Sequence, residues 1–136
     1  MLTKKKGIST KGKKKEAKAR ATIAHGKGVV RINNRNLETV PQKYVLQFIK
    51  EPLDLAGSLA TEVDIDVHVL GGGFIGQAVA SRSAIAKALV EYARDEKLRK
   101  KFLAYDRLLL VDDPRRVEPK KPLGGKARKR KQLSKR

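Results

Sequence analysis

Residues 62–93 read EVDIDVHVLGGGFIGQAVASRSAIAKALVEYA, and this stretch decides the fold. In residues 62–70 an aliphatic residue stands at every second position, with Asp or His between them. Alternation with a period of two predicts a strand with one buried face. Three glycines then lead into residues 74–93, an Ala-rich amphipathic segment that predicts a long helix. The centre of the protein is therefore expected to be a strand, a glycine turn and a helix.

The segment upstream repeats the strand pattern. Residues 17–23 place Ala17, Ala19, Ala21 and Ile23 on one side and basic or hydroxyl side chains on the other. This pattern predicts a half-buried strand with a basic outer face. Residues 25–28 (His-Gly-Lys-Gly) form a turn signal, and residues 29–32 predict a second strand, so we expect these two strands to pair as a hairpin.

Helical patterns complete the body. Pro41 opens a helix whose apolar stripe includes Val45 and Ile49, and Pro52 is expected to limit it. A short helical turn is expected over residues 53–59, and another helix over residues 97–104. The fold class is therefore α+β (mixed α/β), a small sheet covered by helices on one face with the other face available. Strand order does not follow from the sequence.

The charge of the chain is concentrated at its two ends. The net charge is +19, of which residues 1–35 contribute +11, residues 36–114 contribute −2 and residues 115–136 contribute +10. We divide the chain into a basic, disordered N-terminal extension (1–16), a globular domain (17–114) and an extended basic C-terminal tail (115–136). A near-neutral body with basic extensions predicts nucleic-acid binding.

Several classes of function are excluded or disfavoured. The chain contains no cysteine, which excludes disulfides and Cys-ligated zinc. His25 and His68 have no companion at metal-ligand spacing, so no metal and no cofactor are expected. The basic N-terminus lacks the apolar core of a signal peptide, and no apolar run is long enough to span a membrane. We expect a soluble cytoplasmic protein without a membrane partner.

The glycines at residues 71–76 satisfy the pattern G-x-G-x-x-G between a strand and a helix. A dinucleotide site would also need a second parallel strand ending in an acid about twenty residues on, and residues 74–93 are helical instead. Two readings stay open: a helix N-terminus whose amides bind an RNA phosphate, and a tight connection without a ligand. Asp64 and Asp66 lack a neighbouring base or nucleophile, so we do not expect an enzyme.

The basic ends favour RNA backbone as the ligand. Aromatic residues make up 4% of the chain and none lies in either basic end, so phosphate contacts rather than base stacking are expected. Arg128 and Arg130 can bind phosphate bidentately. Two hypotheses follow, a structural rRNA-binding protein and, as the alternative, a small basic DNA-compacting protein. The near-neutral body and the lack of wedge residues favour the first.

Several blocks, in the right order, resemble one family closely. They are Gly12–Lys15, Ala19–Ala21, Gly26–Asn33, residues 71–89, Arg115–Pro122, Lys126–Arg128 and Ser134–Arg136. Over roughly residues 10–136 the chain resembles the ninth protein of the small ribosomal subunit in its archaeal and eukaryotic form. The resemblance implies a fold like the second domain of the fifth small-subunit protein, with a left-handed β-α-β crossover.

The resemblance also implies partners. It implies binding to rRNA of the head (the 3′ major domain), contacts with neighbouring ribosomal proteins there, and a C-terminal tail that reaches the tRNA in the peptidyl site. The candidate rRNA-binding residues are Lys13, Lys14, Lys15, Lys18, Arg20, Lys27, Arg31, Gly72, Gly73, Gln77, Arg82, Arg115, Arg116, Lys120, Lys121, Lys126, Arg128, Lys129, Arg130 and Lys131. The candidate tRNA-proximal residues are Ser134, Lys135 and Arg136.

Overall fold

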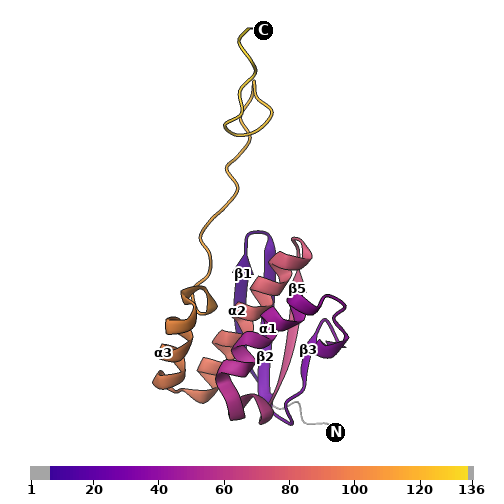
Figure 1. Ribbon diagram of the computed structural model, residues 1–136, viewed down its shortest axis with the longest axis vertical. Coiled ribbons are helices and arrows are strands. Elements are labelled where there is room, and N and C mark those ends of the chain that lie inside the picture. The colour runs from indigo at the N-terminus through magenta and orange to yellow at the C-terminus, as the bar shows by residue number, and fades with distance from the viewer. Residues whose placement is uncertain (1–6, 135–136) are drawn as a thin grey trace.

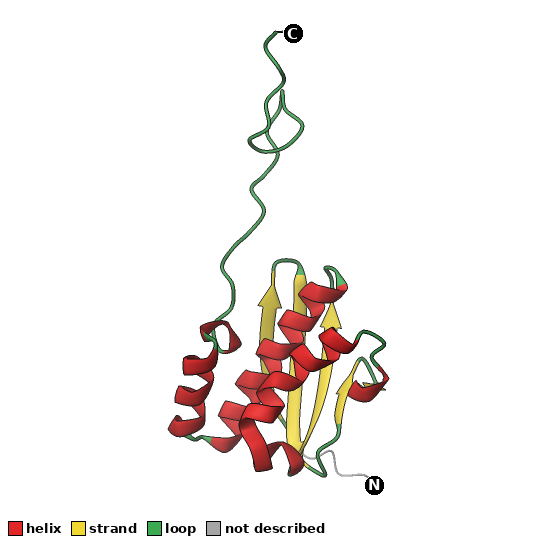
Figure 2. Cartoon of the chain, viewed as in Figure 1, coloured by secondary structure: helices red, strands yellow, loops and turns green. Residues whose placement is uncertain are grey.

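The computed structural model describes residues 7–134 as one sheet with helices on one of its faces (Figure 1, Figure 2). The strands are β1 (Ile8–Lys14), β2 (Ala17–His25), β3 (Val30–Ile32), β4 (Arg35–Asn36) and β5 (Val63–Leu70). The helices are α1 (Lys43–Ala56), α2 (Phe74–Ala93) and α3 (Glu96–Tyr105), with 3-10 turns η1 (Leu37–Thr39), η2 (Gly57–Thr61) and η3 (Arg107–Leu109). This arrangement confirms the predicted α+β class.

The sheet is mixed. Its strand order is β1-β2-β5-β3-β4, and all neighbours are antiparallel except β5 and β3, which are parallel. Along β5, Val63, Ile65, Val67 and Val69 are buried and the residues between them are half-buried or exposed. The apolar face packs under α1 and α2, as Figure 2 shows, and the opposite face is open. The predicted central strand and long helix are both confirmed.

The predicted hairpin between β2 and β3 is wrong. β5 lies between them, and Val67 is in register with Ala21 of β2 on one side and with Ile32 of β3 on the other. The turn at residues 25–28 instead links two strands that do not pair with each other. A pattern of alternation specifies which face a strand buries but not which strand lies beside it, so the sequence could not reveal the insertion.

The N-terminal segment also differs from our expectation. We expected residues 1–16 to lack structure, but residues 8–14 form β1, which pairs with β2 along its whole length. Thr10 and Gly12 face α2: the Thr10 hydroxyl donates to the Ala84 carbonyl at 2.8 Å, and a Cβ on Gly12 would lie 2.3 Å from the Ala80 carbonyl oxygen. This contact with α2 fixes β1. Residues 1–6 lie outside the described part of the chain.

Pro52 does not end α1. The helix continues through it to Ala56, and Pro52 is buried together with Val45 and Ile49. A proline inside a helix costs about 3 kcal/mol relative to alanine because it lacks the N–H that the helix uses. Packing of the apolar stripe against the core therefore outweighs the local preference.

The central helix α2 is buried on nearly all sides. Most of its buried residues, which run from Ala78 to Leu89, are Ala or Ser, and the larger ones are Arg82, Ile85 and Leu89. Small side chains let the sheet approach the helix closely on one side, while α1 packs on another. The predicted helix over residues 97–104 is confirmed as α3, which adds Phe102 to the core. No helix within residues 7–134 is long and apolar enough to span a membrane.

The C-terminal tail leaves the body after Asp113 and projects far beyond it (Figure 1). Residues 114–121 have no regular secondary structure and follow an extended path. The chain then turns back on itself, and Gly124 forms an isolated antiparallel bridge with Arg130. The tail is therefore extended only in its first part, whereas we expected an extended chain throughout.

Candidate nucleic-acid interface

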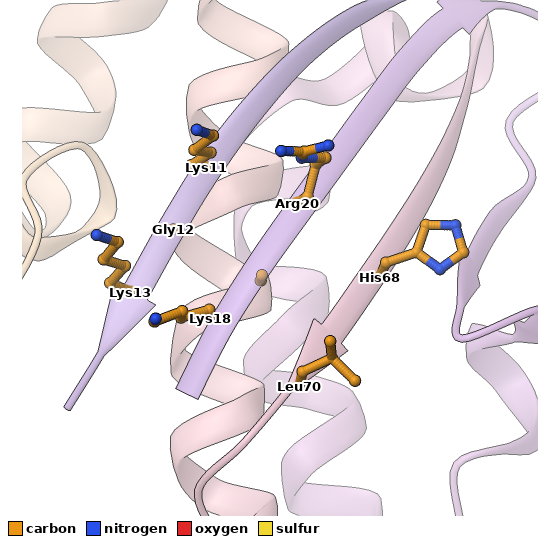
Figure 3. Close-up of a pocket in the computed structure, with 8 residues that line it drawn as sticks. Lys11, Gly12, Lys13, Lys18, Arg20, His68 and Leu70 are labelled. Atoms are coloured by element: carbon orange, nitrogen blue, oxygen red, sulfur yellow. The ribbon is translucent and has the colours of Figure 1, made fainter. Parts of the chain in front are cut away.

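The open face of the sheet has a basic half. Lys11 and Lys13 on β1 and Lys18 and Arg20 on β2 all project from it, as Figure 3 shows. Lys11 is in register with Arg20, and Lys13 with Lys18. Like charges placed directly opposite on neighbouring strands destabilise a sheet. This arrangement therefore favours an anionic ligand over bare solvent.

The basic half borders a shallow, open depression. It is lined by the four basic side chains above together with His68 and Leu70 of β5 (Figure 3). Leu70, the last residue of β5, is 76% exposed on this face. The depression is open to solvent and not enclosed, so it suits an extended ligand such as RNA backbone better than a small enclosed ligand.

The other half of the open face carries both acidic and basic side chains. Asp64 and Asp66 lie on β5, and Asp66 is in register with Thr22 on one side and Arg31 on the other. The Asp64 carboxylate accepts the backbone N–H groups of Val29, at 3.0 Å, and Lys27, at 2.9 Å, and these bonds lower its pKa. Asp64 therefore closes the turn before β3. It is not half of a catalytic carboxylate pair.

The glycine turn lies beside the end of β2. Gly71 and Gly72 have φ values of 78° and 65°, and a Cβ on Gly72 would lie 3.2 Å from the Ala17 backbone nitrogen. The Gln77 side chain donates to the Gly71 carbonyl at 3.2 Å. Gly71, Gly72 and Gln77 are therefore explained by the geometry of the turn, without a ligand. Gly73 differs. It is the N-cap residue of α2, no side chain caps the N–H groups of the first turn, and a Cβ on Gly73 would meet open space.

Arg82 does not lie at the interface, and we correct that prediction. Its side chain is only 8% exposed, and its guanidinium lies 4.3 Å from the centre of the Phe48 ring. It is 2.6 Å from the Glu51 carboxylate and 3.1 Å from that of Asp106. Arg82 therefore joins α2 to α1 and to the segment after α3, and its guanidinium is paired within the protein.

The root of the tail is held by two carboxylates, which we call the tail anchor (Asp112 and Asp113). Asp113 is 6% exposed and binds the side chains of both Arg115 and Lys14. Arg115 first and Lys14 second lower the pKa of Asp113 well below its usual value, so it stays ionised. Asp112 accepts from Lys87 at 2.7 Å. Two predicted RNA contacts, Lys14 and Arg115, are therefore already paired within the protein.

The remaining candidates fall into separate groups. Lys13, Lys18 and Arg20 lie together, and Lys15 is in the adjoining turn between β1 and β2. Lys27 and Arg31 are exposed but lie away from this group, near the opposite end of β2 and on β3. The tail candidates are all exposed: Arg116, Lys120, Lys121, Lys126, Arg128, Lys129, Arg130, Lys131 and Ser134. Lys135 and Arg136 lie outside the described residues.

Two residues of the basic half were not predicted. Lys11 was assigned to the unstructured extension, and His68 was interpreted only as a polar residue of β5. The alternation of Thr10 and Gly12 with Lys11 and Lys13 could have indicated a strand. It was hidden because the inward residues are small or polar, not aliphatic.

Comparison with known proteins decides the family. A family model described as ribosomal protein S9/S16 matches residues 12–136. The chain belongs to the S9/S16 family. It is 46% identical over 117 residues to the small ribosomal subunit protein uS9 of Methanococcus maripaludis strains C5 and C7, covering 86% of this chain and 87% of each relative.

Membership of the S9/S16 family establishes the general role. The protein is a structural, non-enzymatic constituent of the small ribosomal subunit, with rRNA and other ribosomal proteins as partners. It functions in translation, as part of the ribosome in the cytoplasm. Of the two hypotheses drawn from charge, the RNA-binding one agrees with the family and the DNA-compacting one does not.

Proposed function

We propose that this S9/S16 protein binds rRNA of the head, in the 3′ major domain, and reaches the peptidyl-site tRNA with its tail. The observation that carries the proposal is the placement of its charge. Basic side chains gather on half of the open sheet face and along a tail that projects from the folded body. The body is then the part that docks, and the tail is the part that reaches.

Docking is proposed for the basic half of the sheet. Four cations in two facing pairs, at Lys11, Lys13, Lys18 and Arg20, repel one another until phosphates lie between them. Lys15 and the uncapped N-terminus of α2 at Gly73 extend the same side of the molecule and suit further backbone phosphates. Lys27 and Arg31 serve as outlying contacts on the same rRNA.

Reach is proposed for the tail. Its root is fixed to the body by Asp113, and residues 114–121 follow an extended path that covers roughly 25 Å at about 3.3 Å per residue. Its basic residues from Arg116 to Lys131 contact phosphates along the path, and Ser134, Lys135 and Arg136 approach the tRNA. The single acid of the tail, Glu118, lies near its base.

Deleting residues 126–136 tests the reach of the tail. We expect the body to fold and to join the small subunit, because none of the core or sheet contacts involves these residues. We expect tRNA affinity in the peptidyl site to fall about tenfold, since several phosphate contacts are lost. The measurement is filter binding of tRNA to reconstituted small subunits. Equal affinity with and without the tail would contradict its proposed role.

The double variant Lys18→Ala, Arg20→Ala tests the docking face. We expect affinity for an rRNA fragment of the head to fall, and the slope of log affinity against log salt to decrease by about 2, because two phosphate contacts are removed. Lys97→Ala, Lys100→Ala on the exposed side of α3 is the matched control, with the same loss of charge at another site. If both double variants weaken binding equally, the sheet face is not the docking surface.

A further inference from the structure

The tail contains a closed loop at residues 124–130. Gly124 bridges to Arg130, and the Gly125 N–H donates to the Lys129 carbonyl at 3.1 Å. Before the loop, Leu123 has a φ of 66°, a left-handed conformation that leucine seldom adopts. Figure 1 shows the chain crossing over itself at this point. The loop is therefore a defined structure within a segment of charge and composition typical of disorder.

The loop concentrates charge that an extended tail would spread out. Glu118 and Arg128 are ten residues apart, roughly 33 Å in an extended chain. In the structure the Arg128 Nε atom lies 2.9 Å from the Glu118 carboxylate. The folded-back chain thus brings Glu118, the single acid of the tail, into a hollow that is also lined by Lys120, Lys126, Arg128 and Lys129.

A hollow of about 460 Å³ lies within this loop. It is lined by residues 121–124 and 126–130, and none of them is acidic. The cationic side chains that line the hollow are all exposed. The size suits one or two backbone phosphates with their riboses.

We propose that residues 121–130 form a preformed site for converging phosphates of folded rRNA, recognised by the shape of the backbone and not only by its charge. The inference rests on the proposed rRNA-binding function and adds to it a specific element and a specific ligand chemistry. A bend in rRNA brings successive phosphates together, and a compact group of cations matches that bend better than an extended chain does.

The free loop is held by few contacts. They are the Gly124–Arg130 bridge, to which the Gly125–Lys129 hydrogen bond belongs, and an ion pair whose arginine is 84% exposed, and exposed pairs contribute little. Mutual repulsion of the cations opposes closure. An anion in the hollow removes that repulsion, so closing the loop and binding phosphate favour each other. In a simple run of positive charge, phosphate binding would not depend on closure of a loop, and this dependence distinguishes the proposed site.

Two adjacent glycines provide a matched test that leaves the charge unchanged. A Cβ on Gly124 would lie 2.4 Å from the Lys129 carbonyl oxygen, which is part of the loop's backbone, so Gly124→Ala prevents closure. A Cβ on Gly125 would meet only the Lys129 side chain, at 3.8 Å, so Gly125→Ala leaves the loop intact. Both positions lie in the tail, so neither change affects folding of the body.

The experiment measures binding of the full chain to a bent rRNA fragment of the head and to a straight RNA duplex of equal length. We expect Gly124→Ala to weaken binding to the bent fragment about tenfold, because a preorganised site is lost, and to leave duplex binding unchanged. We expect Gly125→Ala to stay within about twofold of the wild type on both RNAs.

Other outcomes overturn the proposal in distinguishable ways. Equal binding by Gly124→Ala, Gly125→Ala and the wild type would show that the loop is not a site, while leaving the rRNA-binding function intact. If the wild type binds an acidic polypeptide more tightly than the bent RNA, the ligand of the loop is an acidic polypeptide and not RNA. The third comparison uses a chain truncated after Pro114. If this chain binds the bent fragment as tightly as the full chain does, the tail does not contribute to rRNA binding.

Discussion

Replacing Arg82 by alanine is expected to destabilise the body by about 3 kcal/mol, because it breaks a largely buried charge cluster. Glu51 and Asp106 would remain side by side without their shared cation, and their side chains are only 25% and 33% exposed. The ring of Phe48 would also lose the guanidinium that lies over it at 4.3 Å. The contacts of α2 with α1 and with the segment after α3 would then be weakened.

The measurement is urea unfolding followed by circular dichroism, with the midpoint and slope compared between variants. Arg99→Ala is the control, because Arg99 makes only an exposed contact of 3.8 Å with Glu96 and its loss should cost less than about 0.5 kcal/mol. If Arg82→Ala unfolded like Arg99→Ala, the cluster would not be stabilising. We expect RNA affinity of folded Arg82→Ala to match the wild type.

Gly12→Ala is expected to cost about 3 kcal/mol of unfolding free energy, because no side chain fits at this position of β1, where the strand backbone lies against α2. The added Cβ would lie 2.3 Å from the Ala80 carbonyl oxygen and 2.7 Å from the Ala84 nitrogen, both of which are helix backbone. Relief requires β1 to move away from α2. That movement would break the buried hydrogen bond from Thr10 to the Ala84 carbonyl.

Gly76→Ala provides a control of opposite sign. Gly76 lies in the first turns of α2, and a Cβ there would have ordinary contacts, 3.6 Å from the Ala17 Cβ. Alanine is favoured over glycine within a helix by about 0.5–1 kcal/mol, so this variant should be slightly more stable than the wild type. Thermal unfolding of the two variants checks the pair. A neutral Gly12→Ala would mean that β1 does not pack as described.

The elements that the sequence predicted are those with strong local periodicity. β5 alternates four aliphatic residues without a break, and α2 extends for 20 residues from a glycine turn, so both were found with the correct fold class. β1 was missed because Thr10 and Gly12 face a helix that is distant in sequence. Pairing order and the continuation of α1 through Pro52 likewise depend on tertiary packing, which no local pattern contains.

The same limit applies to the candidate interface. Charge counting identified basic residues correctly as a class, but it cannot tell a free cation from one that is already paired. Arg82 is bound by Asp106, 24 residues away, and Lys14 by Asp113, 99 residues away. The basic half of the sheet became visible only once β1 and β2 were known to be neighbours. The sequence therefore predicted which type of residue binds the ligand, but not which of the basic residues lie together on the surface.

The tail anchor has a consequence for the order of events during synthesis. Lys14 emerges early and Asp113 is added 99 residues later, so the bond that fixes the root of the tail cannot form until nearly all of the body exists. Contacts so distant in sequence form late in folding because a long loop must close first. The direction in which the tail leaves the body is thus fixed only after the body has folded. An unfinished or misfolded copy would carry the same charges on a tail whose direction relative to the sheet is not fixed.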